Sequence, residues 1–274
     1  MFFNADTKLF AVIGFPVKHS FSPVMHNAWF KDEKLNCLYL AAQISPKDLK
    51  QAFKAFKTLG FCGINVTVPH KNAAVKCVDF ADDSVKAVGS LNTVAFKNGK
   101  LYGYNTDYCG FADDLKEKKA AVKNSSVFVY GAGGAAKAVI YALKKAGAKK
   151  ISAANRTFAK AQSIARRFKV GAVKNAEIAE AISQADLIVN ASSCGMNKTD
   201  ALPFKPSSVK KDAIVYDLIY NKQTPFKIFA KRYNLKFFSG EGMLARQGAQ
   251  AFKIWTGIYP DTKKASRLLK KFMR

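Results

Sequence analysis

The sequence predicts an α/β protein built from two domains, and three observations lead to that prediction. The chain has 274 residues, a length that suits two domains or one large one. Short apolar runs that end at Gly or Pro alternate along the chain with helix-forming stretches, as strands and helices do in α/β proteins. In the second half, an apolar run leads through a glycine-rich turn into an alanine-rich helix, which is how a doubly wound parallel sheet begins.

The first hundred residues are predicted to alternate between strands and helices. Apolar runs predict strands over 9–15, 38–44, 61–68, 93–96 and 101–104. The last two form a hairpin, because Asn98-Gly99 between them is a typical tight turn. Ser22 is predicted to cap a helix that has Pro23 in its first turn. A second helix begins in the same way at Ser45-Pro46, and Lys71 is expected to begin a third.

A lysine-rich polar stretch over 116–126 separates the two halves. Beyond it, buried-type strands are predicted over 127–130, 150–154, 187–191 and 214–218, with helices between them. A helix over 243–255 and a basic helix at the C-terminus complete the chain. The sequence contains no internal repeat and no low-complexity linker.

The chain is strongly basic, with 45 Lys and Arg against 19 Asp and Glu, a net charge of +26. Such a charge suggests nucleic-acid binding. The basic residues, however, are spread along the chain, and no nucleic-acid-binding motif accompanies them. Solubility is the favoured explanation over nucleic-acid binding. Attraction of small anionic ligands is a third explanation that stays open.

Cysteine usage and apolar run lengths narrow the class of protein further. The five cysteines form no C-x-x-C pair, so neither a disulfide scaffold nor a zinc site is expected. We expect no metal site of any kind. No stretch of 18 residues lacks a charge, which excludes a membrane-spanning helix. The N-terminus has neither a basic nor a long apolar segment of a secretory signal, so a cytoplasmic protein is expected.

The turn after the predicted strand 127–130 has the composition of a dinucleotide-binding loop. Gly131 permits a tight turn, and Gly133 lets the backbone approach a pyrophosphate lying on the helix N-terminus. Ala136 allows close packing between helix and strand. An ordinary strand–helix turn would explain the glycines alone, but their place between a strand and a helix favours cofactor binding.

The residues that end the next strand indicate which dinucleotide binds. An NAD site has Asp or Glu there, to accept hydrogen bonds from the ribose hydroxyls. This chain instead has Asn155-Arg156-Thr157, with Lys160 one turn later. Arg156 can form a charge-assisted contact with a 2′-phosphate, so the sequence favours NADP. Asn155 and Thr157 can also cap the helix from Phe158, and both readings can hold together.

Polar clusters stand at three places where strands end in the first half. Ser20 and Ser22 follow the first strand, and hydroxyls at this spacing can donate to one carboxylate. The run 65–71 ends the third strand, and the runs 91–93 and 105–107 bracket the hairpin. A turn or a cap would explain each cluster by itself. Their combination beside a dinucleotide domain indicates a site for a polar substrate.

With these motifs in their order, the chain resembles the shikimate dehydrogenase family. The motifs that carry the resemblance extend from Ser20 to Gln247: Ser20-Phe21-Ser22-Pro23, Asn65-Val66-Thr67-Val68-Pro69-His70-Lys71, Gly89-Ser90-Leu91-Asn92-Thr93, Gly103-Tyr104-Asn105-Thr106-Asp107, Gly131-Ala132-Gly133-Gly134-Ala135, Asn155-Arg156-Thr157, Asn190-Ala191-Ser192-Ser193-Cys194-Gly195-Met196, Tyr216-Asp217-Leu218-Ile219-Tyr220 and Gly242-Met243-Leu244 with Gln247. One departure is Ser192, where the family usually has Thr.

The resemblance implies a role for each matching residue. Lys71 and Asp107 would be the catalytic pair, and Ser20 and Ser22 would hold the substrate carboxylate. The substrate ring and its hydroxyls would be surrounded by Asn65, Thr67, Asn92, Tyr220 and Gln247, with Lys71 and Asp107 also in contact. NADP(H) would be held by Asp83, Gly131, Ala132, Gly133, Gly134, Ala135, Asn155, Arg156, Thr157, Phe158, Ala159, Lys160, Leu218 and Gly240.

The resemblance also implies the architecture and the reaction. Residues 1–106 with the C-terminal helices 241–274 would form the substrate domain, and 107–240 a Rossmann-type NADP domain, with a deep cleft between them. The reaction would be reversible, NADPH-dependent reduction of 3-dehydroshikimate to shikimate, in chorismate and aromatic amino acid biosynthesis. The ligands would be small molecules, without nucleic acid or membrane, and a homodimer is compatible with the sequence.

Three alternatives remain open at this point. A quinate/shikimate dehydrogenase with broader substrate or cofactor use has the same motifs, although Asn155-Arg156-Thr157 speaks against NAD. A methylene-tetrahydrofolate dehydrogenase has a similar two-domain build, but the Ser20/Ser22 pair and the Tyr220 motif argue against it. A basic nucleic-acid-binding protein with a degenerate cofactor fold is the alternative from another class.

Overall fold

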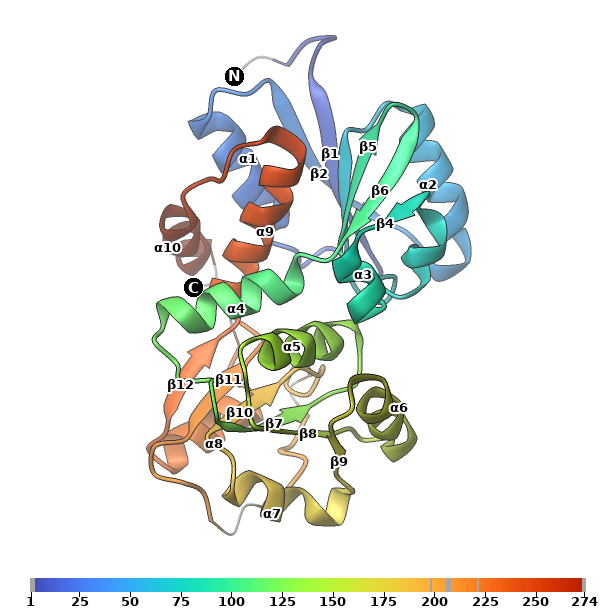
Figure 1. Cartoon of the computed structure of the whole chain (residues 1–274). Coiled ribbons are helices and arrows are strands. Elements are labelled where there is room, and N and C mark those ends of the chain that lie inside the picture. The colour runs from blue at the N-terminus through green and yellow to red at the C-terminus, as the bar shows by residue number, and fades with distance from the viewer. Residues whose placement is uncertain (1–2, 198, 206–207, 221, 273–274) are drawn as a thin grey trace. The chain divides into compact units, whose positions relative to one another are not determined.

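The computed structural model describes residues 3–197, 199–205, 208–220 and 222–272. The chain folds into two compact units, one formed by Met1–Gly110 with Leu244–Arg274 and the other by Phe111–Met243 (Figure 1). Each unit contains a six-stranded sheet, so the α/β prediction is confirmed. Met273 and Arg274, at the end of the predicted C-terminal helices, lie outside the described residues.

The first unit contains a mixed sheet in the order β2-β1-β3-β5-β6-β4. Its strands are β1 Lys8–Gly14, β2 Cys37–Gln43, β3 Gly63–Val66, β4 Phe80–Ala81, β5 Thr93–Lys97 and β6 Lys100–Tyr104. Its helices are α1 Ser22–Asp32, α2 Leu49–Thr58 and α3 Asp83–Val88, and, from the C-terminal segment, most of α9 Glu241–Thr256 and all of α10 Thr262–Phe272. β1 is parallel to β2 and β3, whereas β5 is antiparallel to both of its neighbours.

The apolar run of β1 is continuous because helices cover both faces of the strand. Phe10 and Val12 belong to a core cluster with residues of α1, α9 and α10, including Phe252. The alternate residues Ala11 and Ile13 belong to a second cluster with residues of α2. The two-residue period of the strand therefore divides one apolar run between two cores.

The second unit contains a wholly parallel sheet in the order β12-β11-β10-β7-β8-β9. Its strands are β7 Ser126–Tyr130, β8 Lys150–Ala154, β9 Gly171–Ala172, β10 Leu187–Asn190, β11 Ile214–Asp217 and β12 Lys236–Ser239. Its helices are α5 Gly134–Lys145, α6 Phe158–Phe168, α7 Ile178–Ser183 and α8 Pro225–Arg232, and α4 Asp107–Glu117 enters it from the first unit. This strand order is that of the dinucleotide-binding fold, and the order reverses between β7 and β10.

Two local predictions are wrong. Phe21, not Ser22, is the N-cap of α1, and no side chain caps that helix. Ser22 is already the first helical residue and is buried, so its hydroxyl is left for other contacts. Lys71 lies in a turn, because a 3₁₀ helix begins only at Ala73. The cis peptide bond between Val68 and Pro69 bends the chain before that helix.

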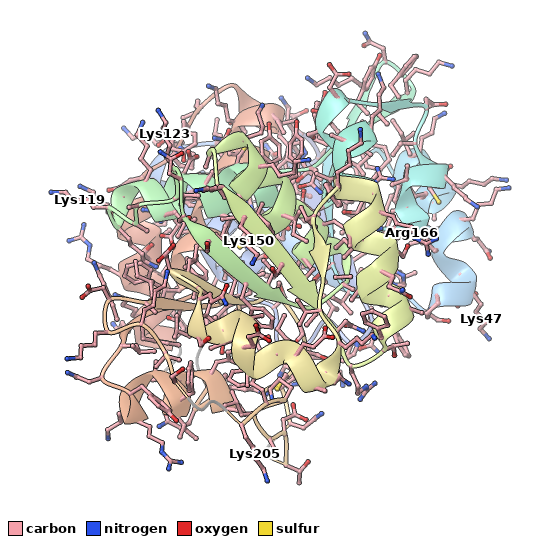
Figure 2. All side chains as sticks on the ribbon, turned by 60° about the horizontal axis from the view of Figure 1, so that its bottom comes forward. Lys47, Lys119, Lys123, Lys150, Arg166 and Lys205 are labelled. Atoms are coloured by element: carbon pink, nitrogen blue, oxygen red, sulfur yellow. The ribbon has the colours of Figure 1, made fainter. Side chains whose placement is uncertain are left out.

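The basic side chains do not gather on one element. In the second unit, Lys119 and Lys123 point outward from the loop between α4 and β7, and Lys205 points outward from the segment between β10 and β11 (Figure 2). Among the described residues, no group of His, Cys, Asp or Glu is arranged to hold a metal ion. Within the same part of the chain, no helix is both long enough and apolar enough to cross a membrane.

Candidate active site

Lys71 and Asp107 form an ion pair in the first unit. Lys71 follows β3 in the turn, and Asp107 is the first residue of α4. The Lys71 Nζ atom lies 2.5 Å from Asp107 Oδ2, with side chains 16% and 5% exposed. Because Asp107 is buried and Lys71 retains some exposure, the carboxylate holds an ammonium that a solute can still reach.

Asn92 connects this pair to Gln247, which was also predicted, and to Thr106. Its Nδ2 atom donates to Asp107 Oδ1 at 2.9 Å and to Gln247 Oε1 at 3.1 Å. The same atom donates to Thr106 Oγ1, and Asn92 Oδ1 accepts from the Thr106 amide at 2.7 Å. Asn92 therefore fixes the carboxylate that holds Lys71 and links it to Gln247 on α9.

Asn65 is buried on β3, and both the nitrogen and the oxygen of its side-chain amide form hydrogen bonds within the protein. Its Nδ2 atom donates to the Asn92 carbonyl and to Thr93 Oγ1, each at 3.0 Å. Its Oδ1 atom accepts from the Tyr39 hydroxyl at 2.6 Å. One lone pair of Oδ1 is left for a ligand. Tyr39 was not predicted from the sequence, because a Tyr in an apolar strand reads as core.

Ser20 and Ser22 lie close together before α1. The Ser22 amide donates to Ser20 Oγ at 3.3 Å, so the two residues form a local hydrogen bond. Thr67 follows β3, and its methyl group packs on Gly14, where a Cβ atom would approach Thr67 Cγ2 to 2.5 Å. A side chain at position 14 would therefore displace Thr67.

The glycine turn of the second unit lies where the strand order reverses. Gly131 has a φ of +135°, and a Cβ atom there would lie 2.5 Å from the Ala191 carbonyl oxygen at the end of β10. Gly133 faces open space, with no atom within 4 Å of its Cβ position. Gly133 is also the N-cap of α5, which has no side-chain cap. The first backbone N–H groups of α5, in Gly134 and Ala135, can therefore donate hydrogen bonds to a pyrophosphate.

The loop after β8 presents its polar side chains to solvent. Arg156, Thr157, Ala159 and Lys160 are exposed, and Asn155 and Phe158 are half-buried. Asn155 Nδ2 donates to the Thr157 carbonyl at 3.1 Å. Thr157 is the N-cap of α6, but its side chain makes no capping bond. The Thr157 hydroxyl is therefore available to a phosphate.

Leu218 and Gly240 lie against each other at the ends of β11 and β12. A Cβ atom at Gly240 would meet the Leu218 carbonyl oxygen at 2.1 Å. The loop after β11 is fixed by buried Asp217, which accepts from the Asn190 side chain, the Thr224 hydroxyl and the Ile219 amide. Burial raises the pKa of Asp217 to about 6.

The two remaining predicted residues differ in their surroundings. Tyr220 follows β11 and is half-buried, and burial raises the pKa of its hydroxyl. Asp83 stands in the first turn of α3, with a side chain 99% exposed, and pairs with Lys86 at 3.2 Å.

Fold and site together define a class of enzyme. A doubly wound parallel sheet with an open glycine turn at the reversal point binds a nicotinamide dinucleotide. A basic, acid-free loop after the second strand suits the 2′-phosphate of NADP. An ammonium held by a buried carboxylate among amide side chains suits proton exchange with a hydroxyl or ketone. These features are those of an NADP-dependent oxidoreductase.

Comparison with known proteins gives the family. Three family models match: a shikimate dehydrogenase substrate binding domain over residues 12–94, shikimate / quinate 5-dehydrogenase over 114–202, and a shikimate 5'-dehydrogenase C-terminal domain over 240–270. The chain is 48% identical over 254 residues to a shikimate dehydrogenase (NADP(+)) from Aquifex aeolicus, covering 93% of each chain. The chain belongs to the shikimate dehydrogenase family.

Two solved structures show how far the similarity of fold extends. Shikimate 5-dehydrogenase from Thermus thermophilus, in complex with NADP(H) and shikimate, matches with a TM-score of 0.89 and 34% identity, over 96% of this chain and 99% of that one. Quinate dehydrogenase from Corynebacterium glutamicum, in complex with NAD, matches with a TM-score of 0.88 and 30% identity, over 97% and 99%. The fold is thus shared by relatives whose names differ in substrate.

Proposed function

We propose that this chain catalyses the reversible NADPH-dependent reduction of 3-dehydroshikimate to shikimate, in chorismate and aromatic amino acid biosynthesis. The Lys71–Asp107 pair, at 2.5 Å and tied through Asn92 to Gln247, is the observation that carries the proposal. It supports the proposal because it lies within the unit that matches the family's substrate binding domain.

Each domain has a separate role in this proposal. Residues 1–106, completed by 241–274, bind the substrate, and residues 107–240 bind NADP(H). Ser20 and Ser22 hold the substrate carboxylate. The ring and its hydroxyls meet Asn65, Thr67, Asn92, Tyr220 and Gln247. The family resemblance also assigns Asp83 a contact with the cofactor. Asp83 is exposed in the first unit, and of the proposed contacts this one has the least support from the structure.

The chemistry of the first unit follows from the ion pair. NADPH supplies the hydride that reduces the ketone carbon. Negative charge then develops on the carbonyl oxygen, and the Lys71 ammonium stabilises it and delivers a proton. Asp107 holds that ammonium in place, and Asn92 orients the carboxylate through its other oxygen.

The loop after β8 determines cofactor choice in this proposal, and Arg156→Ala tests it. We expect the variant to bind NADPH about 10- to 100-fold more weakly, because it loses a charge-assisted contact to the 2′-phosphate. Binding of NADH, which has no 2′-phosphate, should change little. Titration of both dinucleotides measures this, with Arg166→Ala, on the exposed face of α6, as control. Equal losses for both cofactors would contradict the assignment.

The decisive test of the proposed function is NADP reduction with shikimate and, separately, with quinate, followed by NADPH absorbance. Turnover on shikimate with NADP, and little with quinate or NAD, is the expected result. Comparable rates with quinate or NAD would instead favour the broader quinate/shikimate dehydrogenase. No turnover on either substrate would refute both assignments.

Location and assembly are part of the same proposal. We propose a cytoplasmic enzyme that binds small molecules and no nucleic acid, and we retain the homodimer as the assembly to test. Analytical ultracentrifugation measures the assembly. Steeply salt-dependent DNA binding at submicromolar protein would contradict the absence of a nucleic-acid partner.

A further inference from the structure

Tyr39 has a hydroxyl group that is buried yet makes a specific contact with the proposed substrate site. The residue lies on β2, at the edge of the first unit's sheet (Figure 1), and is 1% exposed. Its hydroxyl donates to Asn65 Oδ1 at 2.6 Å. Because Oδ1 faces this donor, Asn65 Nδ2 must face the opposite way, toward Asn92 and Thr93. The Asn92 carbonyl can only accept and so fixes which way the Asn65 amide faces, and the Tyr39 hydroxyl, by donating to Oδ1, holds the amide in that orientation.

That orientation matters to the rest of the site through a short series of contacts. Asn65 Nδ2 donates to the carbonyl of Asn92, whose side chain holds Asp107. Asp107 in turn holds Lys71. The Ser22 side chain also interacts with the Tyr39 hydroxyl. One buried hydroxyl thus connects residues proposed to bind the two ends of the substrate.

Two consecutive residues of α1 hold Tyr39 itself. Asn27 Nδ2 donates to the Tyr39 carbonyl and Asn27 Oδ1 accepts from the Tyr39 amide, each at 2.9 Å. The His26 ring stacks on the Tyr39 ring, with centroids 4.3 Å apart and planes 2° from parallel. The backbone of Tyr39 and its ring are therefore fixed independently, and its hydroxyl has little freedom to leave Asn65.

We propose that Tyr39 is a positioning residue for the dehydrogenase reaction, which holds the Asn65 amide in place without touching the substrate. The inference rests on the proposed function, because it takes the residues around Asn65 as the substrate site. If the Tyr39 hydroxyl served only packing, its removal would not change the kinetics for shikimate selectively. A positioning hydroxyl affects shikimate more than NADP, since its contacts lie in the first unit.

The test is steady-state kinetics of Tyr39→Phe with shikimate and with NADP. The variant keeps the ring on His26 and loses only the hydroxyl, so Asn65 Oδ1 loses its donor. We expect kcat/KM for shikimate to fall about tenfold, the scale of one lost buried hydrogen bond, with KM for NADP unchanged. Tyr102→Phe is the matched control, because Tyr102 lies on β6 of the same sheet and stacks on Phe80 instead.

A double-variant experiment separates positioning from stability. If Tyr39 acts through Asn65, then Tyr39→Phe combined with Asn65→Ala should be no worse than Asn65→Ala alone. Independent, multiplicative losses would overturn the proposal, and so would a KM for NADP that rises by as large a factor as kcat/KM for shikimate falls. Thermal unfolding of each variant shows that it is folded under the assay conditions.

The activity of the wild-type enzyme distinguishes a failure of this inference from a failure of the proposed function on which it rests. No turnover of shikimate by the wild type would overturn the proposed function and this inference together. An active wild type whose Tyr39→Phe variant keeps its full kcat/KM for shikimate would overturn the positioning role alone. Selective loss for shikimate that disappears in the Asn65→Ala background supports both.

Discussion

Lys71→Ala is expected to lower kcat for shikimate oxidation by at least ~10², the scale of lost acid–base catalysis. The variant leaves Asp107 without the ammonium that lies 2.5 Å away, and it removes the side chain proposed to exchange the proton of the reacting hydroxyl, which must lose that proton in this direction. KM for shikimate should change modestly, because the carboxylate and ring contacts remain. Steady-state kinetics with saturating NADP measures both constants.

Lys264→Ala is a matched control for that experiment. Lys264 also pairs with an aspartate, Asp32, at 2.7 Å, but its side chain is 58% exposed. An exposed pair contributes little to stability, and we expect kcat to stay at the wild-type value. Turnover by Lys71→Ala that matched this control would remove Lys71 from the mechanism.

His26→Phe is expected to make the protein markedly more resistant to acid. His26 is fully buried among aromatic rings, and neither of its ring nitrogens has a hydrogen-bond partner within the described part of the chain. Burial lowers its pKa from 6.5 to about 3. As the pH falls from 6.5 toward 3, the unfolded chain binds a proton that the native state excludes. Native stability is therefore lost over this interval, by about 3 kcal/mol at pH 4.

Urea unfolding at pH 4 and pH 8 measures the effect. Because Phe cannot bind the proton, the variant should lose less stability between the two pH values than the wild type. At pH 8 it should be at least as stable, since two unsatisfied nitrogens are removed. His19→Phe is the control, as His19 is exposed. An unchanged pH dependence in the His26 variant would show that other groups govern acid unfolding.

The elements with strong local patterns were predictable from the sequence. β8 has the predicted limits, and the glycine turn stands between β7 and α5 as expected. The two-residue strands β4 and β9 were missed, because so short a segment has no hydrophobic period of its own. Ser22 was misassigned as a cap because Ser-Pro is a helix-start signal whether the chain enters the helix at Ser or one residue earlier.

The candidate site was predictable only where its residues belong to motifs. Lys71 and Asp107 are far apart in sequence, but each belongs to a motif that identified it as a candidate site residue. The role of Asn92 as the residue that joins Asp107 to Gln247 depends on how β5, α4 and α9 meet, which no local pattern encodes. Tyr39 lacks a motif entirely, because its contact with Asn65 exists only after β2 and β3 flank β1.

The loop after β8, which we propose determines cofactor choice, is mostly exposed, unlike the confined glycines of the same unit. Arg156, Thr157 and Lys160 are exposed, whereas Gly131 is confined by the backbone at Ala191 and Gly240 by the backbone at Leu218. The loop after β8 should therefore tolerate substitutions that are made to exchange one dinucleotide for another. Libraries randomised at those three exposed positions should yield mostly folded proteins. Substitutions at either confined glycine should instead disrupt the fold before they change the preference for one dinucleotide over the other.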